Sequence, residues 1–99
     1  MATLHIENTV RDFDSWKAAF DKFERFRAER GVRSYRISQK AAAPNEIAVD
    51  LTFDTADAAT EFVVHLEQIW RTPQSKEQML AHSTPTVYEV VVDRELVAG

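Results

Sequence analysis

Three polar side chains share the strand faces that carry apolar residues in this sequence. Asn8, Tyr35 and Tyr88 alternate in step with apolar neighbours, so we expect them to point toward the helices. The helix residues that they would meet are aromatic or apolar: Trp16, Phe20, Phe62, Leu66 and Trp70. Polar groups that project into an aromatic-lined space are typical of a small-molecule site. The alternative is an ordinary core, in which the tyrosine rings pack and their hydroxyls reach the rim.

Charged side chains at the edges of the same helices could add chemistry to such a space. His65 lies about 100° from Leu66 on a helical wheel, at the stripe's edge, where it is either a base or a surface histidine. Arg27 and Arg30 lie about 20° and 40° from Trp16, inside the apolar stripe of the first predicted helix. Paired guanidinium groups suit a carboxylate, phenolate or phosphate. Arginines also favour helix C-termini and lay their stems over the edge of a core.

The opposite face of the predicted sheet carries a second set of charges, and the sequence offers no metal motif. We expect these residues to form a charge network at a dimer interface, in which every member is paired: His5, Glu7, Arg36, Asp50 and Glu89. His82 lies before the last strand, in a predicted loop, and should be exposed. None of the histidines has a partner at a spacing such as His-Glu-x-x-His, so we expect no bound metal.

The elements that must position these residues follow the order βαββαβ. Alternating patterns predict strands at 2–10, 32–39, 46–54 and 86–93. One helix should be capped by Asp12 or Asp14 and stopped by Gly31, and a second should begin after Asp54 or Thr55 and end near Trp70.

Two segments between these elements carry few signals. A turn is expected at 44–45, and residues 71–85 are predicted to form a loop with at most one helical turn, near Gln78.

The order of the elements predicts a ferredoxin-like α+β fold, with an antiparallel sheet of strand order 4-1-3-2 and both helices on one face. The uncovered face could meet a second copy and close an eight-stranded barrel.

Composition limits the function classes. The 99 residues are 44 % hydrophobic and 28 % charged, which is typical of a single globular domain spanning 1–99. Sixteen acidic residues against twelve basic ones argue against a nucleic-acid partner. The absence of cysteine excludes disulfides and thiolate chemistry. With no apolar run near 18 residues and no signal-like N-terminus, we expect a cytoplasmic protein without membrane contact.

Three local patterns resemble the dimeric α+β barrel superfamily of the antibiotic-biosynthesis monooxygenases. They are Asp-Phe-Asp-x-Trp at the start of the first helix, Gly-Val-x-Ser-Tyr before the second strand, and Pro-Asn before the third. The resemblance extends from Leu4 to about Val92 and is strongest to small bacterial members that are described only as cyclase-like. It implies a homodimer and a pocket between sheet and helices.

The resemblance leaves two functions open. The first is a cofactor-independent monooxygenase or cyclase acting on aromatic or polyketide-like compounds, with Asn8 and His65 as catalytic candidates. The substrate-binding candidates would be Trp16, Phe20, Arg27, Tyr35, Phe62, Trp70 and Tyr88. The second is a non-catalytic dimer that binds a small aromatic or apolar ligand or has a stress-related accessory role. An isomerase or dehalogenase-like activity is not separable from the first.

Heme is the cofactor that the resemblance brings into question, because some members of the superfamily degrade it. These members use an asparagine on the first strand, a tryptophan, and a histidine after the tryptophan, a pattern that Asn8, Trp70 and His82 could match. His82 lies in a segment broken by serine and proline, so we expect no proximal imidazole there and no cofactor.

Overall fold

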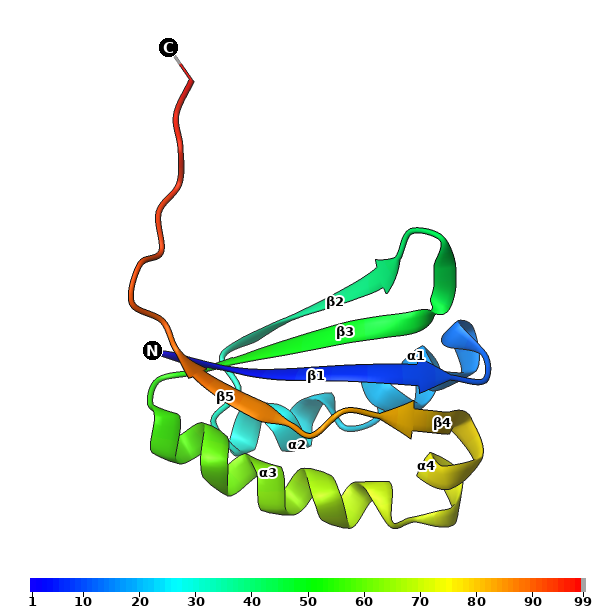
Figure 1. The fold of residues 1–99 in the computed structure, drawn as a ribbon. Helices are drawn as coiled ribbons and strands as arrows, with labels where there is room; N and C mark the ends of the chain where they lie inside the picture. The colour runs from blue at the N-terminus through cyan, green and yellow to red at the C-terminus, as the bar shows by residue number, and fades with distance from the viewer. Residues whose placement is uncertain (99) are drawn as a thin grey trace.

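A five-stranded antiparallel sheet carries its helices on one face, as Figure 1 shows. This computed structural model describes residues 1–98. Its elements are β1 (Ala2–Val10), α1 (Phe13–Asp21), α2 (Glu24–Glu29), β2 (Ser34–Lys40), β3 (Ala43–Phe53), α3 (Ala56–Trp70), α4 (Pro73–Gln78), β4 (Met79–His82) and β5 (Thr86–Glu89). The sheet order is β2-β3-β1-β4, and β5 also pairs with β1. Because β4 and β5 pair with opposite ends of β1, together they take the place of the fourth strand, and the predicted order 4-1-3-2 is confirmed.

The core forms between the inner sheet face and the helices, as the alternating patterns predict. Along β1, Leu4, Ile6 and Val10 are buried, and across the ladder β3 contributes further buried residues, including Leu51 and Phe53. The helices add buried rings from their apolar stripes, Trp16 from α1 and Phe62 from α3. Burial of these side chains is the main favourable term in the folding of the chain.

The predicted helix boundaries are confirmed by their caps. The carboxylate of Asp12 accepts a hydrogen bond from the Ser15 N–H at 2.9 Å, and the Thr55 hydroxyl accepts one from the Ala58 N–H at 3.1 Å. Gly31 ends α2 at a φ of 97°, in the left-handed region that glycine adopts without strain.

The single first helix that the sequence predicts is in fact two helices. The Phe23 N–H donates to the Phe20 carbonyl at 3.2 Å, an i→i+3 bond that tightens the chain between α1 and α2. The same carbonyl accepts a bond from Arg27 Nη2 at 2.7 Å. The α-helix is therefore interrupted at 22–23, and the arginine that the helical wheel placed on the apolar stripe bonds across this junction.

Two connections also differ from the predictions. The hairpin between β2 and β3 turns at 41–42, whereas Pro44 and Asn45 lie within β3, at a shift of the ladder between Gln39 and Lys40. The predicted loop at 71–85 contains α4 and β4. Thr72 caps α4 by accepting from the Ser75 N–H at 3.3 Å, and a proline at the first helical position supports it.

The last strand has the opposite phase from the one predicted. Val87 lies across from Leu4 and packs against the core, whereas Tyr88 lies across from Thr3 on the outer sheet face. The Tyr88 side chain is 56 % exposed and meets the ring of His5 edge-on, with centroids 6.4 Å apart. The irregular connection between β4 and β5 resets the alternation, so pairing with β1 decides which residues face inward.

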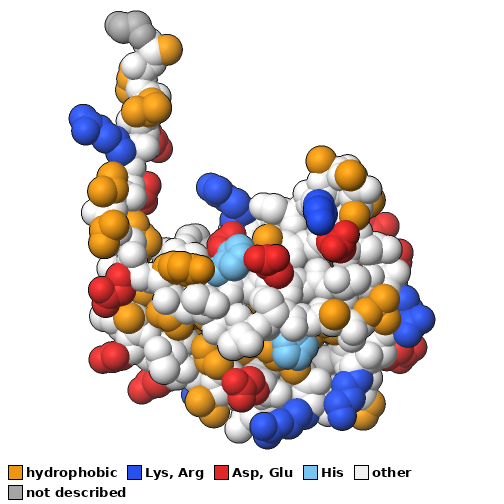
Figure 2. Space-filling view, in the orientation of Figure 1, with side chains coloured by type: hydrophobic (Ala, Val, Ile, Leu, Met, Phe, Trp, Pro, Cys, Tyr) orange, Lys and Arg blue, Asp and Glu red, His pale blue; other side chains and the backbone are white. Residues whose placement is uncertain are grey.

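Beyond β5 the chain leaves the body of the molecule. The Val90 N–H donates to the Met1 carbonyl at 3.0 Å, and after it residues 91–98, which we term the C-terminal arm, extend away from the sheet (Figure 1). Hydrophobic side chains follow this arm in Figure 2. The largest are strongly exposed: Val91 90 %, Val92 80 %, Leu96 91 % and Val97 91 %.

The outer sheet face carries part of the predicted charge network. His5 Nδ1 lies 2.6 Å from Asp50 Oδ1, and His5 Nε2 lies 3.2 Å from Glu7 Oε2. The hydrogen bond with Asp50 is the main cause that raises the pKa of His5. Arg36 lies across from Asp50 in the ladder, whereas Glu89 lies across from Ala2 and not beside His5. The prediction that Glu89 belongs to this network is therefore wrong.

Candidate functional site

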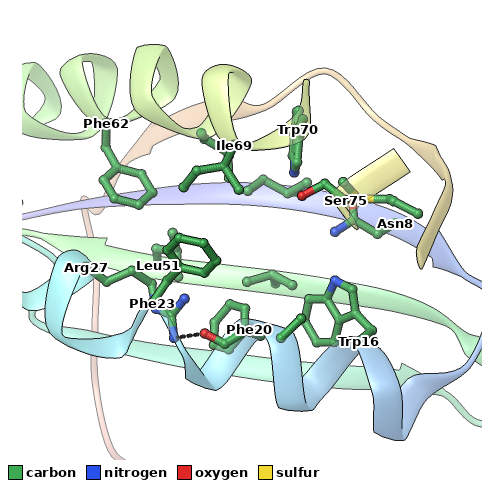
Figure 3. A pocket seen from close by; sticks show the side chains of 15 residues that line it. Asn8, Trp16, Phe20, Phe23, Arg27, Leu51, Phe62, Ile69, Trp70 and Ser75 are labelled. Carbon is green, nitrogen blue, oxygen red and sulfur yellow. Dashed lines mark hydrogen bonds between the residues drawn. The ribbon is translucent and has the colours of Figure 1, made fainter. Parts of the chain in front are cut away.

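A cavity of about 100 Å³ lies between the two helical segments α1–α2 and helix α3, above the inner face of the sheet (Figure 3). Its floor is formed by sheet residues Ile6, Asn8, Val49 and Leu51. Its walls are formed mainly by rings: Trp16, Phe20, Phe23, Phe62 and Trp70. Further lining residues are Ala19, Arg27, Leu66, Ile69, Ser75 and Met79.

Helical spacing explains why these rings converge. Trp16 and Phe20 are four residues apart in α1, so they lie on one face of the helix, with ring centroids 5.1 Å apart. On α3, Phe62, Leu66 and Ile69 follow at intervals of four and three residues, so they also share one face of their helix. The sequence left open whether the rings form a core or a pocket wall. In the structure they do both, because Trp16 and Phe62 belong to the buried core and also line the cavity.

Arg27 brings a positive charge to this apolar space. It is only 5 % exposed, and its Cζ lies 3.5 Å from the centroid of the Phe20 ring. Nη2 donates to the Phe20 carbonyl, while Nε has no hydrogen-bond partner. Burial lowers the pKa of Arg27, against the opposing effect of nearby Tyr35 and Glu24. Within residues 1–98, no carboxylate forms an ion pair with this guanidinium.

Asn8 supplies a neutral polar group at the other end of the cavity. Its side chain is 6 % exposed, and Oδ1 has no hydrogen-bond partner. Asn8, Trp70 and Ser75 lie together at this end, whereas Arg27 lies at the far end (Figure 3). Buried polar atoms are normally satisfied in folded proteins, so Asn8 and Arg27, which line one cavity and each hold an unsatisfied polar atom, are candidate ligand contacts.

The structure brings most of the predicted site residues together. The cavity lining includes Asn8, Trp16, Phe20, Arg27, Phe62 and Trp70. Three others lie outside it. Tyr35 is on the inner face behind Phe20, where its hydroxyl donates to Glu24 Oε1 at 3.1 Å. Burial, followed by this bond, raises the pKa of Tyr35.

Tyr88 and His65 are the other two residues outside the cavity. Tyr88 lies on the outer face of the sheet, as described above, so the prediction that it points toward the helices is wrong. The His65 ring packs edge-on against Phe26, with centroids 5.9 Å apart, and its Nε2 lies 3.4 Å from Arg30 Nη1. Arg30 itself is exposed and does not line the cavity.

Ser75 and Met79 are lining residues that the sequence reasoning missed. Both come from the segment predicted as a loop, and they close the cavity beside Asn8 and Trp70. The Thr72-Pro73 pair, a capping residue followed by proline at the first helical position, is the local signal that could have revealed α4.

Neither a metal ion nor heme fits the residues present. Within residues 1–98, no group of three or more histidine, cysteine or acidic side chains is arranged so that it could hold a metal ion. His82 lies on β4 rather than in a loop, and is exposed as predicted. Its ring stacks on Trp70 with centroids 4.0 Å apart, and it does not line the cavity. A volume of about 100 Å³ is too small for a porphyrin, since an apolar cavity of about 150 Å³ holds only a benzene.

Comparison with known proteins places the fold. No family model and no curated protein matches the chain. Among solved structures, a "Putative antibiotic biosynthesis monooxygenase" from Bordetella bronchiseptica is similar, with a TM-score of 0.68 and 15 % identity over 92 % of this chain and 98 % of that one. Another described in the same words, from Nitrosomonas europaea, has a TM-score of 0.60 and 14 % identity over 93 % and 100 %.

A third similar structure also has this fold. It is described as a dimeric ferredoxin-like protein from an uncultured marine organism, with a TM-score of 0.63 and 12 % identity over 94 % of this chain and 96 % of that one. The chain has the fold of the antibiotic-biosynthesis-monooxygenase-like proteins. This confirms the predicted ferredoxin-like fold, and at these identities the likeness shows the fold alone.

Proposed function

We propose that this protein, with its antibiotic-biosynthesis-monooxygenase-like fold, binds a small aromatic molecule in the cavity between its sheet and helices. The observation that carries the proposal is the ring-walled cavity with the unsatisfied polar atoms of Asn8 and Arg27 in its wall. Its volume of about 100 Å³ limits the ligand to about one ring, since an apolar cavity of about 150 Å³ accepts benzene. Of the aromatic and polyketide-like classes that the sequence suggests, the volume favours a single-ring aromatic.

The reaction that such a site would support is oxidation of the bound aromatic by dioxygen without a cofactor. This chemistry needs an electron-rich carbanion or phenolate that is shielded from water and whose charge is stabilised. The rings around the cavity would exclude water, and the Arg27 guanidinium and the Asn8 amide are the groups that could stabilise charge.

A non-catalytic ligand-binding role is the second candidate, and one observation favours it. Among the cavity residues in the described chain, Arg27 is the only ionisable one, so the lining offers no general base. An oxygenase built on this cavity would need a substrate that ionises without such a base. The His65 ring lies outside the cavity lining, and the variants described below test whether it acts as the base.

We also propose that the protein acts as a homodimer. The outer sheet face lies between the C-terminal arm and the β2–β3 hairpin, both of which project beyond it (Figure 1). The exposed valines and leucine of the arm form an apolar surface of the kind that marks protein interfaces. A dimeric protein of the same fold is consistent with this assembly.

No helix in the part of the chain that the structure describes is both long and apolar enough to span a membrane. A cytoplasmic location is our expectation from the sequence.

Native mass spectrometry and oxygen uptake together test the proposed function. We expect a species at twice 11.3 kDa, and an oxygen electrode should record uptake with phenol, catechol or hydroquinone if the protein is an oxygenase. Asn8→Ala should lower this uptake, whereas His65→Ala should retain it, because the His65 ring packs outside the cavity. Loss of uptake in His65→Ala would restore the histidine as a base. Ligand binding without uptake would support the non-catalytic role.

A further inference from the structure

We infer that the ligand of this cavity is an anion: a planar, single-ring aromatic molecule whose ionised oxygen pairs with the guanidinium of Arg27. The inference rests on the proposed function, since it assumes that the cavity is occupied. It adds the charge of the ligand and the end of the cavity at which its charged group binds, neither of which the fold or the similar structures indicate.

The pairing of charges across the molecule sets Arg27 apart. Arg25 pairs with Glu29 and Arg33 pairs with Asp54, and all four of these side chains are more than half exposed. Arg27 is buried, yet within residues 1–98 it has no carboxylate partner. Burying an unpaired charge is costly, so buried charges in proteins are normally paired or bind a charged ligand.

The nearest acidic groups do not take this role. Glu24 lies three residues earlier on α2, and its carboxylate accepts the hydrogen bond from the Tyr35 hydroxyl. Asp21, at the end of α1, forms an ion pair with Lys17. Both acidic groups act on Arg27 only through space, so the guanidinium of this cavity-lining residue has no bound counter-ion within residues 1–98.

The geometry around the guanidinium suits a flat anion. Nη2 is bound to the Phe20 carbonyl, Nε is buried without a hydrogen-bond partner, and the residue as a whole lines the cavity. An ionised oxygen at the Arg27 end of the cavity would pair with the guanidinium group, and charge-assisted bonds of this kind are the strong ones. The rings of Phe20, Trp16 and Phe62 provide surfaces on which the aromatic ring of the ligand can pack.

Arg27 alone would discriminate between a charged and a neutral ligand. Asn8, at the other end of the cavity, is polar but uncharged, and the remaining lining residues within 1–98 are apolar or neutral. The competing explanation is structural: Arg27 holds the α1–α2 junction through the Phe20 carbonyl and needs no ligand. The two explanations differ in what the wild-type protein binds.

Both tryptophans of the chain line the cavity, which provides a direct readout of its occupancy. In a ¹⁵N-labelled sample, the indole N–H signals of Trp16 and Trp70 are titrated with benzoate and with nitrobenzene, which has nearly the same shape and no net charge. The Trp70→Phe variant assigns the two signals. We expect both compounds to shift them, and benzoate to bind roughly tenfold to a hundredfold more tightly at equal ionic strength.

Two variants separate charge from structure. Arg27→Met should remove the preference for benzoate and leave nitrobenzene binding intact. Arg30→Met is the matched control, since Arg30 lies one turn later and also covers a ring, Phe26, but lies outside the cavity. It should keep the full preference.

Each outcome decides a different point. Equal binding of benzoate and nitrobenzene by the wild-type protein would overturn the anion inference while leaving the cavity as a ligand site. If neither compound shifts the indole signals, the proposed function itself fails. If Arg27→Met does not fold, the wild-type comparison still decides, and Arg27→Lys, which keeps the charge, should retain part of the preference for benzoate.

Discussion

Replacement of Phe62 by alanine should destabilise the protein and enlarge the cavity. The Phe62 side chain is 2 % exposed, and its ring centroid lies 5.5 Å from that of Phe53 and 6.3 Å from that of Phe26. Truncation of such a buried ring costs about 3–5 kcal/mol in unfolding free energy, from lost burial and from the void that is left. With a urea m value of about 1.2 kcal/mol per M, a loss of about 4 kcal/mol lowers the unfolding midpoint by about 3 M.

Phe53→Ala is the matched control for this prediction. Phe53 is fully buried and contacts Phe62, but it does not line the cavity. Its loss should cost a similar free energy, since the chemistry of the substitution is the same. Only Phe62→Ala joins the new void to the existing cavity, so only this variant should gain the capacity to bind a two-ring compound such as naphthalene.

Urea unfolding followed by tryptophan fluorescence, with and without benzene or naphthalene, checks both effects at one fixed protein concentration. Naphthalene should raise the midpoint of Phe62→Ala and leave that of Phe53→Ala unchanged. A loss below about 1 kcal/mol in Phe62→Ala would contradict the packing described for this ring. Equal stabilisation of both variants by naphthalene would contradict the position of the cavity.

Three further predictions concern the outer face, the arm and a helix cap. The hydrogen bond with Asp50 raises the pKa of His5 in the folded protein above its ordinary value of 6.5. The bond therefore stabilises the fold fully below pH 6.5, and this stabilisation is lost as the pH rises through the raised pKa of His5. Asp50→Asn should therefore cost about 0.2–1 kcal/mol at pH 6 and less at pH 8.5, and a pH-independent difference in urea midpoints would refute this. Deletion of the chain after Val90 should convert the dimer to monomers in size-exclusion chromatography, whereas Val64→Asp, which alters an apolar residue on α3 that is 58 % exposed, should not. Thr55→Ala should lower the free energy of unfolding by about 1 kcal/mol, measured by thermal or urea unfolding, because the Ala58 N–H in the first turn of α3 loses its acceptor. Thr55→Ser, which keeps a hydroxyl at this position, should retain most of the wild-type stability.

The parts of the fold that were predictable from the sequence are those with a single strong periodicity. In β1 the apolar side chains occupy alternate positions, so only one face of the strand can be buried. In α3 the stripe from Ala59 to Trp70 and the capping Thr55 fix both the face and the start of the helix. Local pattern and tertiary packing agree in these elements, and for this reason the sheet order was also predictable.

The errors lie where the pattern is ambiguous or where pairing overrides it. The segment 86–93 has apolar residues at both parities, so alternation does not fix whether Val87 or Tyr88 faces inward. Pro44 and Asn45 have strong turn preferences, but the pairing of Thr9 with Glu46 extends the β1–β3 ladder to this point and moves the turn to 41–42.

For the candidate site, the sequence indicated the ring-bearing residues but not their depth. A helical wheel places Arg27 within the apolar stripe of a straight helix, and it does not show the break at 22–23 through which the side chain reaches the Phe20 carbonyl. His65 lies at a stripe edge, where the wheel does not decide between inside and outside. The contact with Phe26 on the neighbouring α2 determines its position, and such a contact has no local sequence signal.

The two central strands connect the proposed ligand site with the proposed dimer face. In β1, Ile6 and Asn8 line the cavity while His5 and Glu7 lie on the outer face. In β3, Leu51 lines the cavity, whereas the preceding residue, Asp50, lies on the outer face and accepts the hydrogen bond from His5. A shift of one residue in the β1–β3 register would move the charged side chains into the cavity and the cavity floor to the outer face. The fold therefore cannot lose one surface without losing the other, and an occupied cavity that holds this register should also preserve the face available to a second copy.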